Sequence, residues 1–439
     1  MGLRDIALAL ILLYLASKVL KRPHWGVYTM AWLGYMNPHR LCYGFMREFP
    51  VVQSMVFLTL ISMYFSKEKF RMVWSREVII LIIMLLWMGI TTTQAFYFHL
   101  AWEQYIKVLK IQMLTLMTIL VLNSRQRIDV LVWVIVLSIG FYGVKGGIFT
   151  IMHGGVYRVM GPDGSFIAGN NEIALAFAMT IPLMRYLQLQ QNRFLFKLGI
   201  GVMMWLTAIA AIGSHSRGAL VALLVTGVIF WLKSRNRLVT ALFIAVATYT
   251  VVNLMPQHWY DRMQTIKTYE EDRSSQGRIN AWWTAFNVAQ DRITGGGFEM
   301  FRYSVFRAYA PDPHMVHDAH SIYFEMLGEH GFIGLGLFLA LLGFTWLKCS
   351  AIIRRCKRDP EKKWAADLAA MIQVSMVGYG SAGAFLGLAY FDYIYHLVAI
   401  TVVLASLTLA RQTVDLEVTA SVRPVSSPGL GAARPAITR

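Results

Sequence analysis

The chain has 439 residues, of which 56% are hydrophobic and only 15% charged, and its formal net charge is +17. Soluble globular proteins carry about 25% charged residues, so this composition excludes an ordinary soluble domain. Apolar runs of about 20 residues recur along the sequence, and such a run is long enough to cross the hydrocarbon core of a bilayer as a helix. The composition therefore predicts an all-α, polytopic membrane protein.

Basic residues and cysteines narrow the function classes further. Lysine and arginine gather in short loops between apolar runs, as the positive-inside rule describes, so the net charge does not indicate nucleic acid as a partner. The three cysteines, Cys42, Cys349 and Cys356, have no metal-ligand spacing and predict neither a disulfide framework nor a zinc site. The first apolar run lacks a strongly basic leader and an A-x-A cleavage site, so we expect it to be a retained helix.

In chain order, the apolar runs predict twelve or thirteen membrane-spanning helices, the uncertain one being the short second run. The predicted spans are Leu3–Leu20, Trp25–Met36, Pro50–Phe65, Glu77–Phe96, Gln104–Leu122, Ile128–Ile151, Asn171–Leu189, Leu195–Gly213, Arg217–Leu232, Leu238–Leu254, Phe332–Leu347, Ala365–Leu386 and Tyr390–Ala410.

Five basic loops predict the orientation of these spans. Lys348–Lys363 carries seven lysines and arginines, which places it in the cytoplasm. Counting back along the spans puts four more basic loops on the same side: Lys67–Arg76, Arg125–Arg127, Arg185–Lys197 and Lys233–Arg237. The other face receives Tyr97–Glu103, His153–Asn170, Ser214–Ser216 and the long, nearly neutral segment Met255–Ser321.

The predicted organisation has four parts. Residues 1–254 form the transmembrane helices of an N-terminal bundle, and residues 255–331 form a long periplasmic loop with amphipathic helices. Residues 332–410 add the C-terminal transmembrane helices. Residues 411–439 are rich in Pro, Ser, Gly and Ala and predict a disordered cytoplasmic tail.

Three ionisable side chains lie within or at the outer ends of predicted spans: Lys145, Arg217 and Asp392. A charge in a span is costly and needs a reason. Each of these side chains could snorkel to the lipid headgroups. Because all three lie at one membrane level, a shared polar site at the outer face is the favoured interpretation.

Four histidines cluster where the long loop re-enters the membrane: His314, His317, His320 and His330. Their spacings match no standard metal-ligand set, so we expect no metal ion. An imidazole that titrates near neutral pH is suited to act as a general base. His314 and His317 are also consistent with ordinary surface histidines. The sequence has no P-loop, GxSxG or HExxH motif, so ATP hydrolysis, serine hydrolysis and zincin chemistry have no support.

Three short motifs in chain order resemble the O-antigen ligase family of membrane glycosyltransferases. The sharpest is His320-Ser321, then nine residues, then Gly331-Phe332-Ile333-Gly334; Ser321 stands where Asn is frequent in the family. The others are Ser216-Arg217-Gly218 and Gly277-Arg278-Ile279 followed by Trp282. The resemblance covers about residues 140 to 400.

A narrower resemblance is to the exosortase-associated O-glycosylation ligase branch, which leaves the acceptor open. It rests on three segments: Tyr142–Gly147, Arg158–Pro162 and Asn170–Ala176.

The resemblance implies a GT-C-like enzyme without a cofactor, in the bacterial inner membrane, with its site facing the periplasm. It implies metal-independent, inverting transfer of an undecaprenyl-pyrophosphate-linked glycan to a lipid A–core hydroxyl. At matching positions His320 is the general base, and Arg217 and Arg278 bind the pyrophosphate, whose developing charge fixed guanidinium groups stabilise. Depth and side make Lys145, Arg158, His317 and Asp392 second-tier candidates.

Three alternatives share many of these features. An O-antigen polymerase uses the same donor with another lipid-linked glycan as acceptor, and an O-glycosylation ligase uses a protein acceptor. A transporter of lipid-linked sugars is disfavoured, because it needs polar residues near the membrane midplane and usually internal repeats. Neither is evident in the sequence.

Overall fold

The structure is a computed structural model, and it describes residues 2–234, 236–264 and 273–409. The tail predicted for residues 411–439 lies outside the described residues, as do residues 265–272 of the long loop. Within the described part of the chain every regular element is a helix. The prediction of an all-α protein is thereby confirmed for those residues.

The first nine α-helices are α1 (Leu3–Lys21), α2 (His24–Met36), α3 (Val51–Phe65), α4 (Arg76–Thr93), α5 (Phe98–Val121), α6 (Arg125–Met152), α7 (Asn170–Gln190), α8 (Phe194–Gly213) and α9 (Arg217–Lys233). The remaining ones are α10 (Arg237–Leu254), α11 (Gln257–Gln264), α12 (Arg273–Asp291), α13 (Tyr303–Tyr309), α14 (Ile322–Cys356), α15 (Lys363–Gly383) and α16 (Asp392–Leu409). Two short 3₁₀ helices, η1 (Pro38–Leu41) and η2 (Phe45–Arg47), follow α2.

Every predicted span corresponds to a helix, but the helices differ in how well they suit a membrane. Six in the described residues are long and apolar enough to cross one, namely α4, α5, α6, α8, α14 and α16. Others are short, such as α3 with 15 residues and α9 with 17, and α7 carries Glu172 and Pro182. The chain is therefore a polytopic helical membrane protein, and the number of twelve spans stays a prediction.

Small residues let the central helices approach closely. A Cβ on Gly143 of α6 would lie 2.3 Å from Thr207 Oγ1 of α8, and one on Gly147 would lie 2.3 Å from the Leu206 carbonyl oxygen. Such small-residue contacts are how helices associate in a bilayer, where apolar burial alone gives little drive. Helix α16 is buried along most of its length, so it forms the centre of the bundle.

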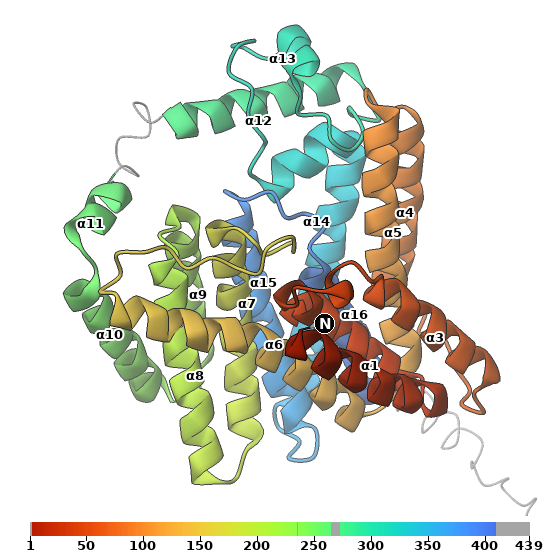
Figure 1. The fold of residues 1–439 in the computed structure, drawn as a ribbon, viewed down its shortest axis with the longest axis vertical. Coiled ribbons are helices and arrows are strands. Elements are labelled where there is room, and N and C mark those ends of the chain that lie inside the picture. The colour runs from red at the N-terminus through yellow and green to blue at the C-terminus, as the bar shows by residue number, and fades with distance from the viewer. Residues whose placement is uncertain (1, 235, 265–272, 410–439) are drawn as a thin grey trace, which may run out of the picture.

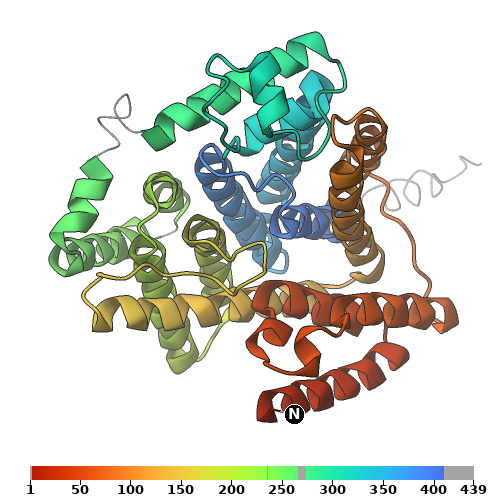
Figure 2. The ribbon, with the colours of Figure 1, turned by 45° about the horizontal axis from the view of Figure 1, so that its top comes forward.

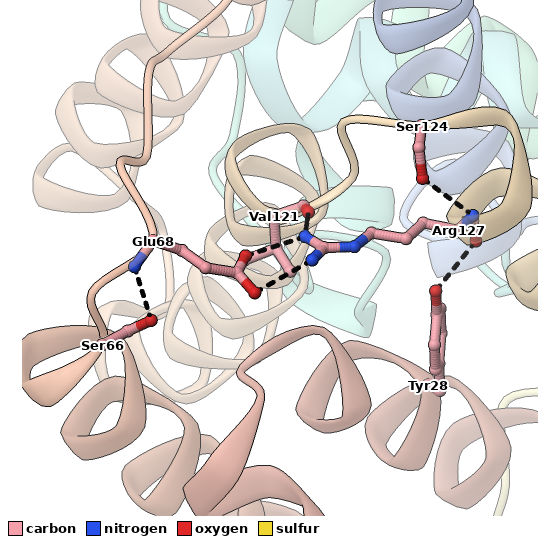
Figure 3. A network of polar contacts seen from close by, with 6 residues as sticks. All are labelled: Tyr28, Ser66, Glu68, Val121, Ser124 and Arg127. Carbon is pink, nitrogen blue, oxygen red and sulfur yellow. Dashed lines mark hydrogen bonds and ion pairs between the residues drawn. The ribbon is translucent and has the colours of Figure 1, made fainter.

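Direct contacts join side chains in or next to the five basic loops that the charge pattern placed on one side. Arg127 forms a two-pronged ion pair with Glu68, at 2.9 Å for each pair of atoms, and its Nη1 also donates to the Val121 carbonyl at 2.8 Å (Figure 3). Arg125 donates to Gln190 and lies 4.9 Å from the Trp364 ring. Two lysines complete the set: Lys348 pairs with Glu77, and Lys233 lies 5.3 Å from the Trp346 ring.

The long segment after α10 covers the other end of the molecule. Figures 1 and 2 both show α12 and α13 above the ends of α4, α5 and α14, while α10 and α11 lie at the opposite edge from α4 and α5. The glycine run at residues 295–297 fixes this cover: Gly296 N donates to Gly328 O at 2.8 Å, and Gly297 N donates to Glu329 O at 2.9 Å. Both acceptors belong to α14.

Helix α14 is broken at the point where the glycine run docks. Gly331 has φ 67° and ψ −173°, which is not helical, and the second half of the helix begins where the sequence predicted the span Phe332–Leu347. This backbone region is accessible almost only to glycine. A Cβ on Gly331 would also lie 2.2 Å from the Ile293 carbonyl oxygen. The first glycine of the Gly-x-x-Gly motif therefore makes room for the loop.

We expect Gly331→Ala to destabilise the protein by about 2 kcal/mol or more, since it combines backbone strain with a clash against the backbone. Gly336→Ala, five residues along the same helix, is the matched control, because nothing lies within 4 Å of its added Cβ. The measurement is the thermal unfolding midpoint in detergent. Equal midpoints for the two variants would contradict the role assigned to Gly331.

The ion pair of Glu68 and Arg127 predicts a pH-dependent stability difference. The hydrogen bond from Arg127 lowers the pKa of Glu68 below its ordinary value of 4.5. A depressed carboxyl pKa contributes stability above the unfolded-state pKa, and the contribution is lost as the pH falls through the folded-state pKa. We expect Glu68→Gln to destabilise by about 1 kcal/mol at pH 7, because the pair is partly exposed.

The difference in melting temperature between wild type and Glu68→Gln should then shrink as the pH drops well below 4.5. Asp359→Asn is the control, because its pair with Lys362 is more exposed and 3.9 Å long. A difference that stays constant from pH 7 to pH 3 would rule out this ion pair as its source.

Candidate functional site

The turn between α8 and α9 positions Arg217. Ser216 caps α9 by accepting from Ala219 N at 3.2 Å, and Ser214 Oγ accepts from Ser216 N at 3.2 Å. His215 has a positive φ of 59°, and its Nε2 lies 2.8 Å from the Gly155 carbonyl oxygen. Arg217 is thus fixed as the first residue of a 17-residue helix, where the helix dipole adds positive potential.

Helix α12 carries Arg278 and is joined to the segment that precedes α14. Asn280 Nδ2 donates to the carbonyl oxygens of Asp312 at 2.8 Å and of Met315 at 2.9 Å. Trp282 Nε1 donates to the Ala319 carbonyl at 2.7 Å. These hydrogen bonds hold Arg278 near the histidines of that segment.

Arg217 and Arg278 line the same two cavities. The smaller has a volume of about 60 Å³, and its polar lining includes Asn171, Ser216 and Ser274. The larger, of about 370 Å³, is walled mainly by apolar side chains: Val221, Ile279, Trp282 and Phe385. The two guanidinium groups therefore stand where a polar recess meets an apolar one.

His320 lines a third cavity, of about 250 Å³, whose other walls are strongly acidic. The carboxylates around it are Glu172, Glu299, Asp318, Glu325 and Glu329. The rings of His317 and His320 lie 5.3 Å apart. His320 itself is partly buried in this cavity wall.

The surroundings of His320 favour its neutral form. Burial first, and then the positive charge of Arg278, lower the pKa of His320 below 6.5, while Asp318 opposes this shift. At neutral pH the imidazole is therefore mostly unprotonated, which is the form that accepts a proton. No group of three or more His, Cys, Asp or Glu side chains in the described residues is arranged to hold a metal ion.

Backbone strain gathers in the same region. Four described residues other than glycine have positive φ: Asn37, His215, Glu299 and His320. Three of them adjoin Arg217 or line the acidic cavity. Such conformations cost about 1–3 kcal/mol each and cluster at functional sites.

The structure brings some predicted residues together and leaves others apart. Arg217 and Arg278 share two cavities, the charge of Arg278 acts on His320, and the ring of His317 lies 5.3 Å from that of His320. Gly277 packs so closely on His317 that an added Cβ would lie 2.6 Å from its ring.

Three second-tier residues do not line these cavities. Lys145 is exposed on α6, and Arg158 is exposed in the following loop, where the next residue, Val159, bonds to Gly213 O. Asp392 begins α16 and faces α2, with its Oδ2 3.2 Å from where a Cβ on Gly34 would be. The predicted polar site shared by Lys145, Arg217 and Asp392 is thus not formed by direct contact.

The remaining histidines have other environments. His314 is exposed, whereas His330 is fully buried between Thr91 and Tyr390. Sequence reasoning missed Asn171 and Ser274 in the small cavity and the five carboxylates around His320. One signal was present: Glu325 and Glu329 are four residues apart and therefore share a helix face just after His320.

Residues 202–339 match the model of a family described as O-antigen ligase, and residues 3–192 match the model of a family of unknown function, DUF5935. Curated proteins gave no match. Among solved structures, the chain is similar to one described as "Structural coordination of polymerization and crosslinking by a peptidoglycan synthase complex".

That similarity is 15% identity with a TM-score of 0.40, over 76% of this chain and 98% of the other, and a score this low supports no conclusion. The helices and the family match define a membrane protein of the ligase and polymerase type, which transfers glycosyl groups. The match over residues 202–339 is to the O-antigen ligase family, the family that the motifs predicted. This region contains Arg217, Arg278 and His320.

The two charges beside His320 can be tested by removing each. We expect Arg278→Gln to raise the pKa of His320 and Asp318→Asn to lower it further, because the two charges act in opposite directions. The measurement is the pH dependence of diethyl pyrocarbonate labelling at His320, resolved by peptide mass spectrometry, since only neutral imidazole reacts. Labelling of the exposed His314 serves as the internal reference. Shifts in the same direction in both variants would contradict the assignment.

Proposed function

We propose that this protein transfers a glycan from a lipid-pyrophosphate donor, undecaprenyl-pyrophosphate-linked polysaccharide, to a hydroxyl of lipid A–core at the periplasmic face of the bacterial inner membrane. The observation that carries the proposal is that Arg217 and Arg278 line two common cavities, while His320, close enough to Arg278 to respond to its charge, lines a separate acidic cavity. The arginine cavities suit an anionic leaving group, and the acidic cavity suits a hydroxyl acceptor.

The arginine side fits the pyrophosphate. Two guanidinium groups and the positive end of α9 converge on a polar recess of about 60 Å³. As the glycosidic bond breaks, negative charge grows on the leaving pyrophosphate, and fixed cations stabilise it without reorganising. Guanidinium groups suit phosphate because they donate two parallel hydrogen bonds. The adjoining apolar cavity suits the lipid portion next to the pyrophosphate.

The acidic side fits an acceptor hydroxyl. His320 lines this cavity and is held in its neutral form, so it can take the proton from the attacking oxygen. Attack from the side opposite the leaving group inverts the anomeric carbon. No metal ion is required in this scheme, since the two arginines supply the positive charge.

The side of the membrane is inferred from charge. The five basic loops meet at one end of the molecule, which the positive-inside rule places in the cytoplasm. The long segment with α12 and α13 covers the other end (Figure 1). The candidate site is at this second end, which corresponds to the periplasm.

The acceptor separates the alternatives. A polymerase would use the same arginines and base, but its acceptor would be a second lipid-linked glycan. An O-glycosylation ligase would bring a protein hydroxyl to the same cavity. The function of a transporter remains disfavoured, because the candidate site residues Arg217, Arg278 and His320 lie at one end of the molecule.

We expect the purified protein to transfer polysaccharide from undecaprenyl pyrophosphate to lipid A–core in the presence of EDTA. His320→Ala, Arg217→Ala and Arg278→Ala should each lower the rate about 100-fold or more, because each removes a group that acts on the transition state. The product is measured by gel mobility of the acceptor and by mass spectrometry. Thermal unfolding of each variant shows whether it is folded.

Two variants serve as matched controls. His314→Ala and Arg307→Ala remove an exposed histidine and an exposed arginine from the same outer segment, and both should retain the wild-type rate. Longer lipid-linked glycan with unmodified lipid A–core would identify a polymerase. Loss of transfer in EDTA would refute the metal-independent mechanism.

A further inference from the structure

A chain of buried hydrogen bonds runs from α4 to the wall of the acidic cavity. Thr91 Oγ1 lies 2.7 Å from His330 Nδ1, and His330 Nε2 lies 2.9 Å from the Tyr390 hydroxyl. Tyr390 in turn donates to Glu329 Oε2 at 2.5 Å. Its members come from three parts of the sequence: α4, the first half of α14 and the turn before α16.

Both ring nitrogens of His330 take part in this chain. Tyr390 donates to the Glu329 carboxyl group, and its oxygen also contacts His330 Nε2. On the other side of the imidazole, Thr91 Oγ1 contacts His330 Nδ1 and also donates to the Met88 carbonyl at 3.0 Å. The imidazole therefore links α4 to Tyr390 through its two nitrogens. His330 is thus a structural histidine, unlike His320.

The other oxygen of Glu329 holds the long loop. Glu329 Oε1 accepts from Glu299 N at 2.8 Å, and Glu299 is one of the strained residues, with φ 61°. Glu329 is only 6% exposed, yet both it and Glu299 line the cavity that contains His320. The hydrogen-bond chain therefore ends on the wall of the cavity that the proposed base also lines.

We propose that Glu329 is a positioning residue for the acceptor, held in place by Tyr390 and His330. It keeps the strained turn at Glu299 against the first half of α14, and so sets the shape of the cavity that His320 also lines. This inference rests on the proposed function, since it requires the acceptor to occupy that cavity.

The proposal makes the donor and acceptor sides separable. Arg217 and Arg278 line the two donor-side cavities, and none of Thr91, His330, Tyr390 and Glu329 lines either of them. Weakening this chain of hydrogen bonds should therefore change acceptor binding and leave donor binding unchanged. A general loss of folding would affect both equally.

Tyr390→Phe is the informative variant, because it removes the one hydroxyl that joins His330 to Glu329. Tyr393→Phe is its matched control: it also removes a buried tyrosine hydroxyl, but that hydroxyl bonds to Thr180 at 3.1 Å and lies outside the chain. We expect Tyr390→Phe to raise the acceptor KM about tenfold and to leave the donor KM within twofold. Tyr393→Phe should leave both within twofold.

Hydrogen exchange supplies a second readout that does not depend on transfer. The amide of Glu299 donates to Glu329, so the peptide covering residues 295–302 should exchange faster in Tyr390→Phe than in Tyr393→Phe. Glu329→Gln should behave like Tyr390→Phe, because Glu329 accepts hydrogen bonds at both of its oxygens and the side-chain amide of Gln has only one acceptor oxygen.

The two experiments distinguish the positioning role of Glu329 from the proposed transfer of a glycan. Faster exchange with a selective rise in acceptor KM supports the positioning role of Glu329. Unchanged exchange, or a rise in both KM values, overturns it. Wild-type protein that transfers no glycan to any acceptor refutes the proposed function and the positioning role with it, and the exchange data then show whether the chain holds the loop at all.

Discussion

The break in α14 at Gly331 is the constraint on which the candidate site depends. A continuous helix would leave no room for the glycine run at residues 295–297, whose amides bond to the carbonyls of Gly328 and Glu329. Together with the stacking of Trp282 on Phe324, that docking holds α12 against α14 and so keeps Arg278 at the cavities that it shares with Arg217. Gly331 adopts a conformation that is nearly restricted to glycine. The break that it makes in α14 lets the amides of the loop bond to carbonyls of the helix.

Much of the fold was predictable from composition and pattern. Apolar runs of about 20 residues are visible without any partner, so each predicted span corresponds to a helix. Grouping of the basic loops was also predictable, since it follows from charge alone, and the pairs Glu68–Arg127 and Lys348–Glu77 are consistent with it. The number of membrane-spanning helices was harder to predict, because the length and polarity of helices such as α3 and α7 do not show whether they cross the membrane.

The site was predictable only where a motif marked it. Arg217, Arg278 and His320 each lie in a short motif, and the structure places them around neighbouring cavities. Lys145 and Asp392 were predicted from their depth in the membrane, but depth does not determine where a side chain points. Lys145 is exposed on α6, whereas Asp392 faces α2. The acidic wall needed the tertiary structure, because Glu172, Glu299 and Glu329 are far apart in sequence and meet only when the loop docks on α14.

The arginine-lined cavities and the acidic cavity give the candidate site two regions of different charge. An anion is attracted to Arg217 and Arg278 and disfavoured by the acidic residues around His320, so this charge pattern favours the proposed pyrophosphate-bearing donor at the arginines. A neutral, hydroxyl-rich molecule experiences neither force strongly and can enter the acidic cavity. Charge thereby favours a different region of the site for each of the two proposed substrates.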